Sequence, residues 1–301
     1  MEEIMEMKHR TGSGFDADAI DHTTAADLAE VGSDKWTRYP GCIGAFIAEM
    51  DYGLAPCIQE AIDNACDHCK LGYIPEPWKQ RVAAACAGWQ RSHYGWDVDP
   101  SIIRVVPDVL EAYEIFLREL VGAGNSVIVP TPAYMPFLSV PKLYDVNVIE
   151  IEMLQSGDTE TGEAQWLFDF DAIERAFAAG CHAFVLCNPH NPIGKVLTLE
   201  EELRLSDLAA QYDVRIFNDE IHAPFVFEGK HIPFPTISEQ AALQSMTATS
   251  ASKSFNIPGT KCAQVLLTNP KDRDMWAVKA EWSEHQTATI GAIATTAAYN
   301  E

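Results

Sequence analysis

Basic residues are scarce in this chain. Its 301 residues include 21 Lys and Arg against 44 Asp and Glu, which gives a formal net charge of −23 at pH 7. A surface this acidic repels phosphate backbones and anionic lipid. We therefore expect neither nucleic acid nor a membrane as a partner.

Long apolar runs are missing from the N-terminus. Glu2, Glu3 and Glu6 interrupt the first residues, and no uninterrupted apolar core follows them. Signal peptides and membrane spans both need such a core. We expect neither of them here, and a cytoplasmic location as the default.

Cysteines are too few for a disulfide framework in a chain of this length, and we expect all eight to be reduced thiols. Cys66 and Cys69 form the only C-x-x-C spacing. A zinc site would need a second ligand pair with comparable spacing, which the sequence lacks. We interpret the pair as part of a helix surface rather than as a metal or redox site.

Short apolar runs recur along the chain and alternate with stretches of helical pattern. The composition, with 47% hydrophobic and 22% charged residues, is that of a globular protein with a sizeable core. Strands that alternate with helices indicate an α/β fold, with a mostly parallel central sheet and helices on both faces. The runs expected as strands are 102–106, 126–130, 147–152, 183–187, 214–218, 246–250 and 263–268.

Helical patterns cover residues 109–121, 169–179 and 198–212, and Thr198 with Glu201 forms a capping box at the start of the last one. The stretch 277–301 is helix-like to its final residue and offers neither glycine nor asparagine beyond a plausible C-cap. We therefore expect the chain to stop within this helix.

A lysine before a tight turn is the most informative candidate for chemistry. Lys253 follows an apolar run and small hydroxyl residues, and turn-forming residues come directly behind it. A lysine that forms a Schiff base needs a neutral amine, so it must lie in a desolvated or cationic site. Asp219 ends another apolar run, where a carboxylate can keep a pyridine nitrogen protonated, and Asn191 can donate to a ring hydroxyl. Together these residues suggest pyridoxal phosphate as the cofactor.

A phosphate group needs hydroxyls, N–H groups and positive charge. Ser250 and the amides of Val109 and Leu110, at an expected helix start, can bind it, and Lys261 adds charge. Tyr134 lies on a loop after a strand, where its ring can stack on the cofactor.

Each of these residues also has an ordinary interpretation. Taken alone, Lys253 is a solvated surface lysine, Asp219 a strand-end cap and Tyr134 a core aromatic. Their order along the chain favours the cofactor site. His190 and His222 are more typical of hydrogen-bonded histidines near strand ends, and neither has the spacing of a metal site, so we assign them no catalytic role.

Several motifs carry a family resemblance from about Phe15 to the end of the chain. They are Phe15-Asp16, Lys35-Trp36, AEMDY at 48–52, Gly72-Tyr73, PTPAY at 130–134, NPHNPIGK at 188–195, NDEIH at 218–222 and SASKSFNIPG at 250–259. In this combination the chain resembles the class I/II aminotransferase family of fold-type I pyridoxal phosphate enzymes. The NPHNP, DEIH and SKSFN pieces most resemble its branch of cystathionine β-lyases and cysteine-conjugate β-lyases.

The resemblance implies cofactor roles for Lys253, Asp219, Asn191, Tyr134 and Ser250. These are the same roles that the chemistry of the residues suggests. It also implies a homodimer in which Tyr73 reaches the phosphate of the neighbouring subunit. The implied domains are residues 1–50 as a segment contributing to a small domain, 51–272 as the large cofactor domain, and 273–301 as a linking helix with the start of an incomplete small domain.

Three residues depart from the family pattern. Asp108 replaces the usual glycine at the phosphate-binding helix start, where its charge would oppose a phosphate unless it points away. Lys261 replaces an arginine and keeps the charge without the bidentate fork. His222 replaces a tyrosine common in aminotransferases, which favours the lyase branch. The chain also ends soon after Lys253, before the segment that in relatives carries the arginine for the substrate carboxylate.

The function expected from this resemblance is a carbon–sulfur β-lyase. Lys253 would remove the Cα proton of a cystathionine or cysteine S-conjugate, and the products would be a thiol, pyruvate and ammonia. Two alternatives remain open, which are an aminotransferase and a protein that binds the cofactor without catalysis.

Overall fold

The computed structural model describes residues 23–51, 53–157 and 165–300. The N-terminal glutamates, the Phe15-Asp16 pair and Tyr52 of the sequence motifs lie outside these residues.

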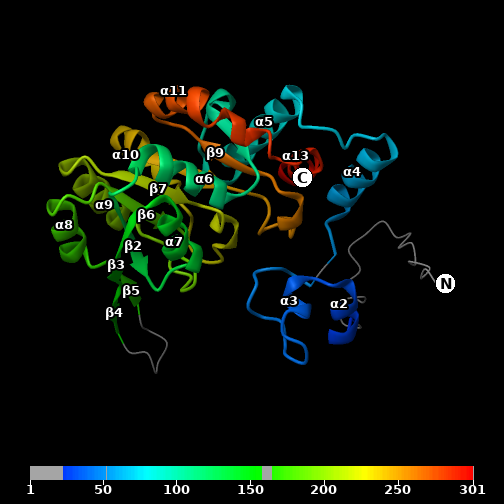
Figure 1. The fold of residues 1–301 in the computed structure, drawn as a ribbon, viewed down its shortest axis with the longest axis horizontal. Helices are drawn as coiled ribbons and strands as arrows, with labels where there is room; N and C mark the ends of the chain where they lie inside the picture. Colours follow the sequence, from blue (N-terminus) through cyan, green and yellow to red (C-terminus); the bar gives the residue numbers. More distant parts are fainter. Residues whose placement is uncertain (1–22, 52, 158–164, 301) are drawn as a thin grey trace.

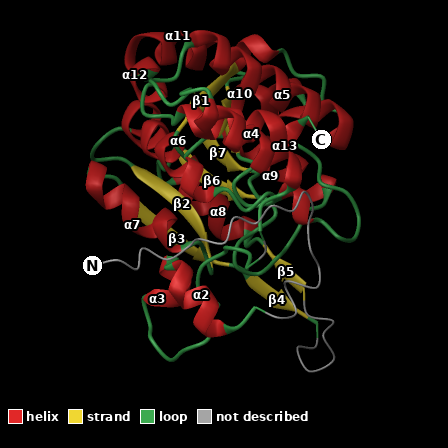
Figure 2. Cartoon of the chain, turned by 90° about the vertical axis from the view of Figure 1, so that its right-hand side faces the viewer, coloured by secondary structure: helices red, strands yellow, loops and turns green. Residues whose placement is uncertain are grey.

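A seven-stranded sheet forms the centre of the molecule (Figures 1 and 2). Its strand order is β1-β9-β8-β7-β6-β2-β3, and β9 alone runs antiparallel to its neighbours. The predicted α/β fold with a mostly parallel sheet is therefore confirmed. The strands are β1 (Ile103–Val106), β2 (Ser126–Thr131), β3 (Asn147–Glu152), β6 (Ala183–Cys187), β7 (Arg215–Asp219), β8 (Ser245–Thr249) and β9 (Ala263–Leu266), with a separate hairpin of β4 (Leu154–Ser156) and β5 (Gln165–Leu167).

Helices cover both faces of this sheet, as the apolar runs predict. The central strands are buried on both sides because successive side chains point to opposite faces: Val185 packs in one core cluster, and Phe184 and Leu186 pack in another. The helices are α2 (Ala25–Val31), α3 (Asp34–Thr37), α4 (Pro56–Asp67), α5 (Glu76–Tyr94), α6 (Val109–Phe116), α7 (Met135–Ser139), α8 (Phe170–Ala178), α9 (Leu199–Gln211), α10 (Glu239–Gln244), α11 (Pro270–Lys279), α12 (Glu281–Glu284) and α13 (Thr289–Tyr299).

Two helix predictions need correction. The segment 109–121 is α-helical only to Phe116 and continues as a π-helical turn, η2 (Leu117–Val121). The stretch 277–301 is not one continuous helix, because non-helical residues separate α12 from α13. Asn300 is the C-cap of α13. Contacts distant in sequence explain this break, since the Ala288 amide donates to the Lys261 carbonyl and the Thr289 hydroxyl donates to the Gly72 carbonyl.

The C-terminal helix packs closely on the main body of the molecule. Ala294 and Ala298 of α13 lie in one core cluster with Ile58 of α4 and Cys86 of α5. Gly291 permits this approach, because a Cβ there would lie 2.0 Å from the Thr260 carbonyl oxygen. The division at residue 273 stays a prediction.

The segment with α2 and α3 lies to one side of the α/β body (Figure 1). No described helix has the length and apolar character needed to cross a bilayer. Cys66, in α4, and Cys69, just beyond it, are both exposed.

Candidate active site

Three neighbouring strands end at the same edge of the sheet, and the predicted site residues follow them. Cys187 at the end of β6 pairs with Asp219 at the end of β7, which pairs with Ala248 in β8. The carboxyl edge of a parallel sheet is where such folds bind ligands. This register brings the loop after Cys187, the Asp219 side chain and the loop that holds Lys253 to one place.

Asp219 is buried, with only 5% of its surface exposed. Burial raises the pKa of its carboxyl to about 7, and the neighbouring Glu220 adds to this, while the Ile221 amide and Lys253 act in the opposite direction. The Ile221 amide donates to its Oδ1 at 3.0 Å. A buried carboxylate with so little compensation is suited to pair with a protonated ring nitrogen.

Lys253 lies in a tight loop between β8 and β9. The Phe255 amide donates to the Ala251 carbonyl at 3.0 Å, and the Ile257 amide donates to the Ser252 carbonyl at 3.0 Å. Burial lowers the pKa of the Lys253 amine, although the carboxylates of Glu49 and Asp219 partly oppose this. A lowered pKa raises the fraction of neutral amine, the form that reacts with a carbonyl.

Tyr134 and the start of α6 lie on the same side of the site. Burial raises the pKa of the half-exposed Tyr134 phenol, and the carboxylates of Asp219 and Asp108 raise it further. Asp108 is the N-cap of α6, and its Oδ1 accepts from the Glu111 amide at 2.9 Å. Its Oδ2 lies 2.9 Å from Nζ of Lys261.

The Asp108–Lys261 pair brings the N-terminus of α6 next to a basic side chain, as the phosphate prediction requires. The same pair also changes the expected electrostatics, because the two residues that depart from the family pattern form an ion pair with each other. The amides of Val109 and Leu110 are the first two of α6, and helix geometry leaves such amides without an intrahelical acceptor.

Ser250 is buried, and its hydroxyl already takes part in two hydrogen bonds. It donates to the Cys262 carbonyl at 2.9 Å and accepts from the Ser252 amide at 3.1 Å. To donate to a phosphate, this hydroxyl must give up Cys262. Its role at a phosphate stays a prediction.

Asn191 lies half-buried in the loop after β6, which other polar groups hold in place. Asn188 donates to Oε1 of the buried Glu202 at 2.7 Å and accepts from the Leu197 amide at 3.1 Å. His190, which lies between Asn188 and Asn191 in the sequence, is also buried.

His222 and Tyr73 differ greatly in exposure. His222 is partly buried, and burial together with Lys253 lowers the pKa of its imidazole. Tyr73 is 92% exposed, on the loop whose Gly72 carbonyl is bound by Thr289. Its side chain is therefore almost entirely accessible within one chain. Its expected contact with a second subunit stays a prediction.

Residue types alone indicated no role for the segment around Met50, which lies against the lysine loop. The Met50 amide donates to Oδ1 of Asn256 and the Met50 carbonyl accepts from Nδ2 of Asn256, both at 2.9 Å. Lys35, which is buried, donates from Nζ to the Glu49 carbonyl and to Oδ2 of Asp51, both at 2.8 Å. In the sequence, the motif residues Lys35, Trp36 and Asp51 were the available signal that this segment matters.

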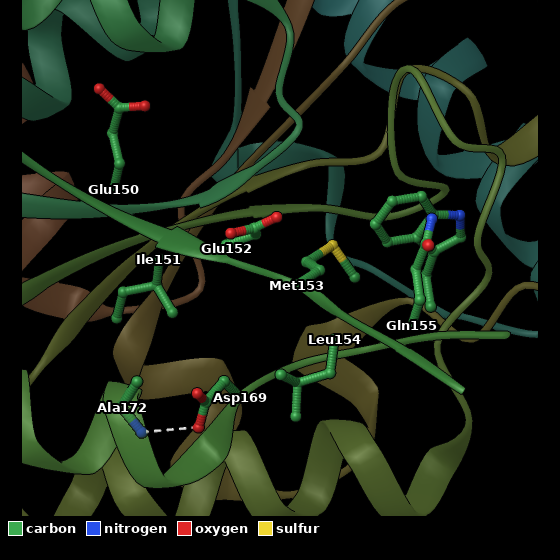
Figure 3. Close-up of a pocket in the computed structure, with 9 residues that line it drawn as sticks. Glu150, Ile151, Glu152, Met153, Leu154, Gln155, Asp169 and Ala172 are labelled. Atoms are coloured by element: carbon green, nitrogen blue, oxygen red, sulfur yellow. Dashed lines mark hydrogen bonds between the residues drawn. The ribbon is translucent and has the colours of Figure 1, made fainter.

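Two hollows lie outside this site. One of about 610 Å³ is lined by β3, β4 and the start of α8, where Asp169 accepts from the Ala172 amide (Figure 3). Another of about 600 Å³ lies between α5, β1 and α12, where Glu284 binds Nζ of Lys79 at 2.7 Å and Nε1 of Trp276 at 2.9 Å. None of the predicted site residues lines either hollow.

The chemistry of the gathered groups fits pyridoxal phosphate. Lys253 has the lowered pKa that Schiff-base formation needs, and the buried Asp219 matches a pyridinium nitrogen. The start of α6 with Lys261 matches a phosphate. The site and the sheet that carries it define a fold-type I pyridoxal-phosphate-dependent enzyme.

Comparisons with known proteins identify the family. The sequence profile of the aminotransferase class I and II family matches residues 49–300, and the chain belongs to this family. It is 35% identical over 268 residues to the cystathionine beta-lyase of Corynebacterium glutamicum, covering 89% of this chain and 69% of that protein.

Two solved structures are similar to most of the chain. The putative PLP-dependent beta-cystathionase of Corynebacterium diphtheriae has a TM-score of 0.84 at 34% identity, and the match covers 96% of this chain and 71% of that one. Cystalysin of Treponema denticola, which contains pyridoxal 5'-phosphate, has a TM-score of 0.83 at 27% identity, with 93% and 72% covered.

Proposed function

We propose that this protein is a pyridoxal-phosphate-dependent carbon–sulfur β-lyase acting on cystathionine or a cysteine S-conjugate. The observation that carries the proposal is the presence, at one edge of the sheet, of a Lys253 amine of lowered pKa and the buried Asp219 carboxyl, each of which affects the pKa of the other. The similarity to a cystathionine beta-lyase over 89% of the chain supports the choice of reaction.

The cofactor, when bound, supplies an electron sink for the negative charge that develops at the substrate Cα. Lys253 accepts the Cα proton, and its lowered pKa keeps part of the amine neutral and ready to do so. Asp219 keeps the ring nitrogen protonated, Asn191 donates to the ring oxygen, and Tyr134 covers one face of the ring.

The remaining residues bind the phosphate. Lys261, the amides of Val109 and Leu110, and the Ser250 hydroxyl hold it in one subunit, and Tyr73 of a second copy completes the site. We propose a homodimer on this ground. A cytoplasmic location also stays a proposal.

The elimination balances without a redox partner. The Cα–H bond breaks as Lys253 takes the proton, and the Cβ–S bond breaks as sulfur leaves with its electron pair. The thiolate then takes a proton to become the thiol. Water hydrolyses the remaining enamine to pyruvate and ammonia.

An aminotransferase is the alternative reaction within the same family. Both reactions begin with loss of the Cα proton; in the lyase sulfur then leaves Cβ, whereas in an aminotransferase the bound cofactor would take up the amino group. His222, in place of the tyrosine common in aminotransferases, favours the lyase. A protein that binds the cofactor without catalysis is the second alternative.

Product analysis of the purified chain with pyridoxal phosphate tests the proposal. We expect pyruvate and a thiol from cystathionine without any keto-acid acceptor. Amino transfer that requires an acceptor would indicate the aminotransferase, and cofactor binding with neither product would indicate the inactive protein.

The variant K253A tests the site itself. We expect it to lose the visible Schiff-base band and to lower any activity by about 10²–10⁴-fold, as for loss of a general base. K230A, which removes an exposed lysine elsewhere, is the matched control and should behave as wild type. An unchanged K253A spectrum would overturn the site assignment.

A further inference from the structure

His190 makes a buried contact that the proposed reaction does not use. The residue is 3% exposed, and its Nε2 lies 2.8 Å from the Pro132 carbonyl oxygen. A carbonyl only accepts, so Nε2 carries the hydrogen and donates it. Burial lowers the pKa of this imidazole and favours the neutral form that makes the bond.

This hydrogen bond joins two loops that are distant in sequence. Pro132 lies two residues before Tyr134 in the loop after β2, and His190 lies one residue before Asn191 in the loop after β6. Strands β2 and β6 are neighbours in the sheet, but the hydrogen bonds of their ladder stop before these loops begin. Beyond the sheet, the imidazole ties one loop to the other.

The backbone on the His190 side is already fixed, so the imidazole has a firm base. Its amide donates to the Lys195 carbonyl at 2.7 Å, and its carbonyl accepts from the Gly194 amide at 2.8 Å. Asn188 anchors the start of the same loop on Glu202. The loop that carries Tyr134 is the less enclosed side of this contact, since the Tyr134 side chain is 37% exposed.

We propose that His190 is a positioning residue that sets the spacing between the Tyr134 ring and the Asn191 amide. It acts through the hydrogen bond from its Nε2 to the Pro132 carbonyl. It holds the Tyr134 ring, which is proposed to cover the face of the pyridine ring, at a fixed distance from the Asn191 amide, which is proposed to bind the ring oxygen. The inference rests on the cofactor site of the proposed function and names no new reacting group.

Three variants test this role. H190Q keeps a donor at nearly the position of Nε2, whereas H190F fills the space without a donor and H190N is too short to reach Pro132. We expect H190F and H190N to bind pyridoxal phosphate about tenfold more weakly and to shift its absorbance maximum, with H190Q within about threefold of wild type. A larger fall in kcat than in KM for cystathionine should accompany these changes.

Hydrogen exchange of the cofactor-free protein gives a readout independent of activity. Peptides covering residues 131–140 should exchange faster in H190F and H190N, but not in H190Q. If H190F does not fold, H190N decides the matter. Wild-type exchange and cofactor affinity in H190N, or equal damage in H190Q and H190N, would overturn the inference.

A double-mutant cycle with Y134A separates positioning from general stability. If His190 acts through Tyr134, H190N should have little further effect on cofactor affinity in the Y134A background. Equal effects in both backgrounds would contradict the mechanism. A wild-type protein that forms the Schiff base but no pyruvate would overturn the proposed lyase alone, whereas one that binds no cofactor would overturn both proposals.

Discussion

Asp108 and Lys261 show how a pair of side chains can offset two departures from a family pattern. The carboxylate at the start of α6 would repel a phosphate if it stood alone. Instead its Oδ1 caps the helix and its Oδ2 neutralises Lys261. The positive charge that should face the phosphate is thereby shared with a carboxylate of the same chain.

Removing this shared charge should strengthen cofactor binding. D108N keeps a side-chain oxygen for the Glu111 amide, so the helix cap is preserved. We expect it to bind pyridoxal phosphate and inorganic phosphate more tightly, by at most about fivefold, because an exposed ion pair is worth about 1 kcal/mol or less. Titration calorimetry measures this, and D145N, at an exposed turn, is the control. Weaker binding by D108N would show that the carboxylate is not opposing the phosphate.

Glu202 is a fully buried carboxyl behind the loop that carries Asn191. Burial raises its pKa to about 8 from 4.5, and Glu220 contributes in the same direction. One oxygen accepts from Asn188, and the other has no hydrogen-bond partner among the described residues. The folded protein therefore keeps this group protonated at neutral pH.

This proton makes stability depend on pH. Between pH 4.5 and about 8 the unfolded chain releases the Glu202 proton while the folded chain retains it, so the stability falls as pH rises. The slope from this group is about 1.4 kcal/mol per pH unit. We expect E202Q to remove most of it when unfolding in urea is measured at pH 5, 6.5 and 8. E200Q, exposed on the same helix, should leave the slope unchanged; an unaltered slope in E202Q would mean that the carboxyl ionises normally.

The lysine loop and the segment from Lys35 to Asp51 behave structurally as one unit. Asn256 receives and donates one hydrogen bond with the Met50 backbone, and Lys35 fixes the residues on either side of Met50. This arrangement holds Glu49 where its carboxylate acts on the Lys253 amine. Elements far apart in the sequence thus determine the state of the reactive lysine.

The variant N256A should uncouple these two segments. The loss of two hydrogen bonds should cost about 1–3 kcal/mol of unfolding free energy. Proteolysis between residues 35 and 51 should become faster, because the anchor of this segment on the main body is gone. N147A, at an exposed strand position, is the control. Equal proteolysis rates in N256A and wild type would argue against the anchor.

At the scale of the whole molecule, the predicted contact of Tyr73 requires a second copy of the chain. Tyr73 is 92% exposed on a loop that Thr289 of α13 holds, and Ala288 beside it binds the Lys261 carbonyl. If a homodimer places Tyr73 at the phosphate of its partner, each site contains residues of two chains.

Mixing two inactive variants tests this shared site. In the proposed dimer each site takes Lys253 from one chain and Tyr73 from the other. A hybrid of one Y73A chain and one K253A chain therefore has one site with both changes and one site with neither. We expect activity to reappear on mixing after unfolding and refolding together, up to about a quarter of the wild-type value from random pairing. Sedimentation measures the dimer itself. A monomer, or no recovery in a proven hybrid, would contradict the proposed contact.

Local pattern was sufficient to predict the strands of the central sheet. The predicted strand 183–187 matches β6, and 214–218 differs from β7 by one residue at each end, because apolar runs bounded by turn formers are local signals. The break before α13 was missed for the opposite reason. Its causes are the Lys261 carbonyl and the Gly72 carbonyl, which lie far from Ala288 and Thr289 in the sequence.

The chemistry of the site was also readable from residue types. A lysine before a turn and a carboxylate at a strand end suggest the cofactor class, because a Schiff base needs the first and a protonated pyridine nitrogen needs the second. Alternating strands and helices imply parallel strands, whose carboxyl ends lie at one edge of the sheet, but only the structure shows that β6, β7 and β8 are neighbours.

Only the tertiary structure decided how the surrounding side chains are used. It pairs Asp108 with Lys261, gives the Ser250 hydroxyl to Cys262, and directs the His190 imidazole to Pro132. Each of these contacts joins residues that are 12 or more positions apart in the chain. A hydrogen bond or ion pair depends on a separation of about 3 Å between two atoms, and no local pattern in a sequence specifies that separation for residues brought together by folding.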